Sequence, residues 1–161
     1  NFWGVVHGTR AFLPHLIASG DGHLVNVSSI FAFLSVPTQN AYNAAKAAVQ
    51  QFTESLRMEM LAAGHPVDVT CVHPGGIKTA VARSAGAAEG LDSADFAAIF
   101  DSKFARTEAS TAARVILDGV ERRRARVLVG PDAYVLDALV RLFPAGYQKG
   151  TVAISRRFGV V

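Results

Sequence analysis

The apolar residues of this chain follow two alternating patterns along its length. Four segments carry apolar residues at intervals of three and four, which predicts helices with one buried face. Three short apolar runs between them are typical of buried strands. The helical segments are 2–19, 39–63, 107–123 and 133–144, and the runs are HLVNVSS, VDVTCVHP and RVLVG.

Turn-forming residues place the ends of these elements. We expect Gly64 to close the second helix, Thr107 to be the N-cap of the third, and Pro144 to mark the end of the fourth. The stretch 78–101 is rich in Ala, Gly and Ser and predicts a mobile segment. The residues after Gly150 give no clear prediction.

Alternating helices and strands predict an α/β fold, with a parallel sheet covered by helices on both faces. Only three strands are expected, and a doubly wound sheet normally has more. The chain also has no initiator methionine and opens directly in a helical pattern. We therefore expect residues 1–161 to form one partial domain, the C-terminal part of a doubly wound sheet in a longer protein.

Composition narrows the class of protein. Of the 161 residues, 50% are hydrophobic and 18% are charged, which favours a packed core over disorder. The net charge is +3, and a nucleic-acid patch would need more basic residues with aromatics between them, so we expect no nucleic-acid partner. The single cysteine excludes an internal disulfide and fits a reducing, cytoplasmic location. No apolar run approaches the roughly 20 residues of a membrane span.

The candidate chemistry lies in the stretch AYNAAK. Tyr42 and Lys46 are four residues apart and share one face of the second helix, while Ser29 ends a strand 13 residues before Tyr42. A lysine ammonium near a phenol favours the phenolate, so we expect Lys46 to lower the tyrosine pKa toward neutrality. Taken alone, such a pair is more often explained by packing of the ring, with the lysine amine reaching the surface, than by catalysis.

The ordered motifs NVSS, YNAAK and HPGGIKT together resemble the short-chain dehydrogenase/reductase (SDR) family. That family has Y-x-x-x-K, a serine about 13 residues upstream, and a P-G-x-[VI]-x-T segment after the next strand. Its N-x-x-G segment resembles residues 1–4, NFWG. The resemblance covers nearly the whole chain and implies a Rossmann fold.

The resemblance implies a role for each matching residue. Tyr42 would be the general acid/base, Lys46 would hold the nicotinamide ribose, and Ser29 would bind the substrate oxygen. Asn1 would hold, through its main-chain carbonyl, a water that links Lys46 to solvent. The seat of the nicotinamide carboxamide would be Pro74, Gly75, Ile77 and Thr79.

The family implies NAD(H) or NADP(H) as cofactor and a carbonyl or secondary alcohol as substrate. The glycine-rich T-G-x-x-x-G-x-G turn that holds the pyrophosphate is absent from these 161 residues. We therefore expect the isolated chain to be inactive. The segment from about 78 to 105 corresponds to the family's substrate lid, and its apolar residues favour a hydrophobic substrate.

Other interpretations remain open. A non-catalytic SDR-like fragment could serve as a scaffold or oligomerisation module, since the helices at 2–19 and 39–63 resemble the pair that forms the family's dimer interface. The resemblance implies a homodimer or homotetramer. A serine hydrolase is disfavoured because the chain has no G-x-S-x-G elbow. We expect Asn26 and His73 to be structural, and the histidines show no metal-binding spacing.

Overall fold

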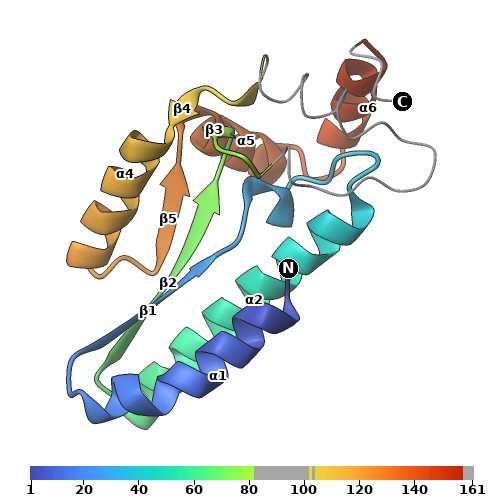
Figure 1. Ribbon diagram of the computed structural model, residues 1–161. Coiled ribbons are helices and arrows are strands. Elements are labelled where there is room, and N and C mark those ends of the chain that lie inside the picture. The colour runs from blue at the N-terminus through green and yellow to red at the C-terminus, as the bar shows by residue number, and fades with distance from the viewer. Residues whose placement is uncertain (82–101, 103, 158–161) are drawn as a thin grey trace.

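A three-stranded parallel sheet forms the centre of the computed structural model, which describes residues 1–81, 102 and 104–157 (Figure 1). Its strands are β1 (Gly22–Val27), β2 (Val67–Pro74) and β5 (Arg126–Val129), in the order β1-β2-β5. In the central strand, Val72 pairs with Val27 on one side and Val127 on the other. All three strands therefore end at the same edge of the sheet, as the sequence predicts.

Helices cover both faces of this sheet (Figure 1). α1 (Trp3–Ala18) and α2 (Asn40–Ala63) lie on one face, and α4 (Ala109–Glu121) lies on the other. Because strand side chains alternate between faces, successive residues join different cores. The first core contains Leu56, Met60, Val67 and Val69, and the second contains Val72, Ala112, Val127 and Val129.

The predicted end of α2 is confirmed at Gly64. This residue has a φ of 66°, in the left-handed region, and its N–H donates to the carbonyl of Leu61. Glycine adopts this conformation without the steric cost that a Cβ imposes, so it ends the helix where the apolar pattern stops.

Two further helices close the carboxyl-terminal part, α5 (Pro131–Leu142) and α6 (Tyr147–Arg157). α5 packs through Ala133 against Leu128 of β5 and Ile30 of the 3-10 helix η1 (Ile30–Ala32). The sequence pattern did not predict α6. It is tied to the β1–α2 connection by the Tyr147 hydroxyl, which accepts a hydrogen bond from the Ser35 N–H at 3.2 Å. No helix in the described ranges is long and apolar enough to cross a membrane.

The expectation that Thr107 is the N-cap of the third helix is wrong. Thr107 belongs to β4 (Thr107–Glu108), which pairs in parallel with β3 (Ile77–Lys78). The N-cap of α4 is Glu108, and no side-chain bond caps the helix. Thr107 lies in a strand because it pairs with Ile77, a distant residue, and helix-end preferences carry no information about such pairing. The expected lid at 78–105 lies mostly outside the described residues, so it stays a prediction.

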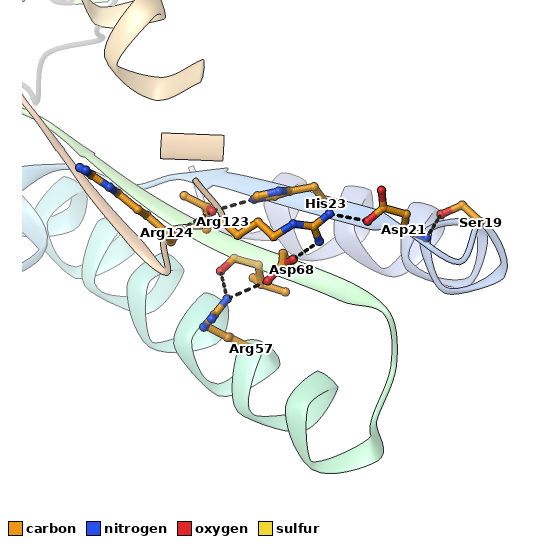
Figure 2. A network of polar contacts seen from close by, with 9 residues as sticks. Ser19, Asp21, His23, Arg57, Asp68, Arg123 and Arg124 are labelled. Atoms are coloured by element: carbon orange, nitrogen blue, oxygen red, sulfur yellow. Dashed lines mark hydrogen bonds and ion pairs between the residues drawn. The ribbon is translucent and has the colours of Figure 1, made fainter. Parts of the chain in front are cut away.

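A polar network joins the amino-terminal ends of the strands, at the edge opposite the loops after β1 and β2 (Figure 2). Arg123 donates to Asp68 at 2.6 Å and to Asp21 at 2.7 Å, and Arg57 lies 3.6 Å from Asp68. Burial is the main reason that the pKa of His23 is lowered there. These ion pairs connect the turn before β1, α2, β2 and the turn before β5. Their charges are partly exposed to solvent, so each pair contributes little to stability by itself.

Candidate active site

Ser29 lies just beyond the carboxyl end of β1, where the chain enters η1. Its Oγ caps this short helix by accepting a hydrogen bond from the Phe31 N–H at 3.2 Å. Its carbonyl oxygen accepts from the Ala32 N–H at 3.1 Å and lies 3.1 Å from Nδ1 of His73. With Oγ used as an acceptor, the hydroxyl hydrogen can be donated to a group beside it.

Tyr42 lies in the first turn of α2, half-buried against Phe31. The two rings meet edge to face, with centroids 6.1 Å apart. Burial raises the pKa of Tyr42 above its ordinary value of 10.0, and a hydrogen bond with the Ser29 side chain lowers it by less. The net direction is upward, opposite to the lowering that we expected from Lys46. At neutral pH this phenol therefore holds its proton.

Lys46 lies one turn further along α2. Its Nζ donates to the carbonyl oxygen of Val27 at 3.0 Å and is 5.6 Å from the centroid of the Tyr42 ring. Burial lowers the pKa of Lys46. The ammonium thus lies against the ring and is held by the last residue of β1. Ser29, Tyr42 and Lys46 nevertheless meet at one strand end, as their spacing predicted.

The neighbouring serine has a different position. Ser28 is buried, and its hydroxyl donates to the carbonyl oxygen of Lys46 at 2.8 Å. It therefore fixes α2 to the end of β1 and does not face Tyr42 through any described contact. Of the two serines, Ser29, at the 13-residue spacing, is the one bonded to Tyr42.

The turn Pro74-Gly75-Gly76 follows β2 at the same edge of the sheet. The Gly75 N–H donates to the carbonyl of Val129 at 2.9 Å, and the Gly76 N–H donates to Oδ2 of Asp132 at 2.7 Å. Ile77 continues into β3, and the Thr79 hydroxyl accepts from Val81 N–H at 3.4 Å. The sequence did not reveal Asp132; its one signal is an acidic residue in the first turn of a helix that follows a strand.

Asn1, which was expected in the site, and Asn26 and His73, which were expected to be structural, differ in their surroundings. Asn1 is exposed, precedes α1, and shares no described polar contact with Lys46, so its role stays a prediction. Asn26 is buried and its amide donates to Thr53 at 3.1 Å and Thr9 at 3.4 Å, which bridges β1 to both covering helices. His73 is fully buried, with its pKa lowered chiefly by burial. Its position against Ser29 makes it part of the scaffold of the site.

A cleft of about 460 Å³ lies on the adjacent face of α2. Its lining includes Phe31 from η1, Asn43 and Ala47 from α2, and Val152 from α6. Among the residues that the structure describes, Tyr42, Ser29 and Lys46 are not part of this lining. Phe31, which lines the cleft, contacts the Tyr42 ring, so the cleft lies next to Tyr42.

The donor set suits a nicotinamide nucleotide. An ammonium has three donors, and one of those on Lys46 is used by Val27, so two remain for ribose hydroxyls. The turn after β2 supplies backbone polar groups at the same edge. The described residues contain no group of three or more His, Cys, Asp or Glu side chains that could hold a metal ion.

Residues 1–90 match the family model for short chain dehydrogenase, which is more than half of the chain. Together with the fold and the Ser29–Tyr42–Lys46 arrangement, this places the chain in the short-chain dehydrogenase/reductase family.

Individual relatives agree with this assignment. "Putative oxidoreductase SadH" of Mycobacterium tuberculosis is 56% identical over 158 residues, which are 98% of this chain and 57% of the relative. A Burkholderia cenocepacia short chain dehydrogenase solved with NADP has a TM-score of 0.68 at 26% identity, covering 98% of this chain and 57% of that one. A Burkholderia phymatum SDR solved with NAD has a TM-score of 0.77 at 24% identity, covering 90% and 56%, and shows the shared fold. The chain thus spans little more than half the length of these proteins.

Proposed function

We propose that a protein containing this chain is an NAD(P)-dependent oxidoreductase that interconverts a carbonyl compound and a secondary alcohol. The observation that carries the proposal is the meeting of Ser29, Tyr42 and Lys46 at the end of β1, with the Ser29 side chain bonded to the phenol. When bound, the nicotinamide supplies or accepts the hydride. The three side chains transfer the proton and orient the reactants.

Tyr42 exchanges the proton with the substrate oxygen. Its raised pKa keeps the phenol protonated at neutral pH, which suits donation to an oxygen whose carbon receives the hydride. In the opposite direction the phenol must first lose its proton. Lys46, 5.6 Å from the ring centroid, is the cation that would favour the phenolate.

Ser29 and Lys46 orient the reactants. The Ser29 hydroxyl lies beside Tyr42, where it would donate to the substrate oxygen and stabilise developing negative charge. Lys46 would hold the ribose through its two remaining donors. We assign Asn1 to the water link with Lys46, and Pro74, Gly75, Ile77 and Thr79 to the carboxamide seat, as the family motifs imply.

The substitution Tyr42→Phe in the full-length protein tests the proposal. It removes the proton donor and keeps the ring, so turnover should fall about 100-fold or more. Oxidation of NADH and of NADPH with 9,10-phenanthrenequinone as the probe carbonyl measures turnover, and quenching of the reduced cofactor's fluorescence measures binding. Unchanged turnover in this variant would remove Tyr42 from the mechanism. Binding of the reduced cofactor that the wild-type protein binds should be retained.

A scaffold or oligomerisation role is the second candidate. Exposed apolar side chains favour it: Trp3 and Phe12 on α1, and Met58 and Leu61 on α2. A homodimer or homotetramer of the full-length protein would cover such a surface. If sedimentation shows an oligomer whereas neither reduced cofactor binds, the scaffold role replaces the catalytic one. The 161-residue chain tested alone should not bind either cofactor.

A further inference from the structure

The side chain of Asp132 fills a slot between two glycines that are distant in the sequence. A Cβ built on Gly75 would lie 2.2 to 2.5 Å from the three carboxyl atoms of Asp132. A Cβ built on Gly130 would lie 2.5 Å from Oδ1. Both distances are far below van der Waals contact, so the carboxylate occupies space that only glycine leaves open at either position.

The same carboxylate is bonded to the turn after β2. Oδ2 accepts the hydrogen bond from the Gly76 N–H at 2.7 Å, and a charged acceptor makes such a bond stronger than a neutral one. From the other side, the Gly76 carbonyl accepts from the N–H groups of Arg106 and Thr107, at 3.0 and 3.1 Å. The turn is therefore clamped between the first turn of α5 and the start of β4.

α5 is a firm support for this bond. Ala133, next to Asp132, is fully buried against the sheet. One turn further along α5, Asp137 receives two hydrogen bonds from Arg126 of β5, at 2.8 and 3.0 Å. The position of Asp132 is thus set by β5, and a carboxylate in the first helical turn is also favoured by the helix dipole.

We propose that Asp132 is a positioning residue that fixes the turn Pro74-Gly75-Gly76, and through it the seat of the nicotinamide ring. This inference rests on the proposed function. Asp132 lies outside the family motifs, and we expect it to affect binding of the nicotinamide end of the cofactor selectively. The adenosine end should not depend on it.

Two substitutions in the full-length protein separate positioning from general damage. Asp132→Ala removes the acceptor, whereas Asp132→Asn keeps an oxygen that can accept from the Gly76 N–H. Calorimetry would measure binding of NADH and NADPH, and of ADP-ribose and 2′-phospho-ADP-ribose, which lack the nicotinamide. We expect Asp132→Ala to weaken binding of the reduced cofactor about tenfold, with the nicotinamide-free compounds unaffected and Asp132→Asn close to wild type.

Equal weakening for both kinds of ligand, or none for either, would overturn the inference. Failure of the wild-type protein to bind NADH and NADPH would instead defeat the proposed function itself. A double-substitution cycle gives a second test if Asp132→Ala alone unfolds. Gly75→Ala should lower the thermal midpoint because of its clash with Asp132, and adding Asp132→Ala should lower it less than in the wild-type background. If the two shifts in thermal midpoint simply add, the close approach of Asp132 to Gly75 is contradicted.

Discussion

The imidazole of His73 bonds to the backbone of Ser29 across the end of the sheet, with Nδ1 3.1 Å from the carbonyl oxygen. His73 is fully buried at the end of β2, and its ring also lies 5.4 Å from that of Phe33. One buried side chain thus holds the backbone of the residue whose hydroxyl we propose to be catalytic.

Replacing His73 should therefore change turnover more than cofactor binding. His73→Leu removes the donor and should lower the turnover of the probe carbonyl, with a loss of about 1 kcal/mol in the free energy of unfolding. His73→Asn retains an N–H near the position of Nδ1 and is the matched control. We expect it to recover most of the turnover. Equal turnover of both variants and the wild-type protein would show that the bond to Ser29 is dispensable.

The thiol of Cys71 should be unreactive in the folded protein. It lies in the central strand at 1% exposure, and burial raises its pKa to about 12. The thiolate is the reactive form, so very little is present at neutral pH. Labelling with a thiol-specific disulfide reagent should be slow in native buffer and fast in denaturant. Rapid labelling under native conditions would mean that β2 is accessible in solution.

Acid should weaken the attachment of α5 through Asp137. Hydrogen bonds from Arg126 are the main reason that the pKa of Asp137 is lowered below its ordinary 3.8. A carboxylate with a lowered folded-state pKa contributes stability above its unfolded pKa, and this is lost as pH falls through the folded value. Below about pH 4, the unfolding free energy of Asp137→Asn should therefore depend less steeply on pH than that of the wild-type protein.

Asp21 provides the control for this experiment. Its pKa is also lowered, by a hydrogen bond from Arg123, but its side chain is 74% exposed against 15% for Asp137. Solvent screens such a pair, so Asp21→Asn should leave urea unfolding nearly unchanged. A larger loss for Asp21→Asn than for Asp137→Asn would contradict the assignment.

Two glycines, one at the end of α2 and one inside α1, should respond to alanine in opposite ways. Gly64 has a φ of 66°, so Gly64→Ala should cost about 1 kcal/mol in the free energy of unfolding. Gly8 lies inside α1, and a Cβ there meets no atom within 4 Å. Gly8→Ala should stabilise by about 0.5–1 kcal/mol, because alanine favours a helix interior. Urea unfolding of the two variants measures both effects, and shifts in the same direction would refute the explanation.

Local sequence patterns predicted much of the fold and the meeting of the central site residues. Helices α1 and α2, the three main strands and the helix end at Gly64 follow from apolar periodicity and helix-end preferences, which act within a few residues. The 13-residue spacing separated Ser29 from Ser28, and the structure agrees: Ser28 bonds to the carbonyl of Lys46, while Ser29 bonds to Tyr42. The tertiary packing overrode local preference at Thr107, where pairing with Ile77 replaced the expected cap.

The chain by itself determined which side chains could do the chemistry and that they would meet at one strand end, because periodicity and spacing are properties of the sequence. Only the tertiary structure decided the pKa values of these side chains and which other residues hold them in place. Whether the pKa of Tyr42 rises or falls depends on burial and on where Lys46 points, and neither is encoded by a four-residue interval. Asp132 and His73 came into contact with Gly76 and Ser29 over 56 and 44 residues of sequence, respectively, because parallel strands bring the loops at their carboxyl ends together.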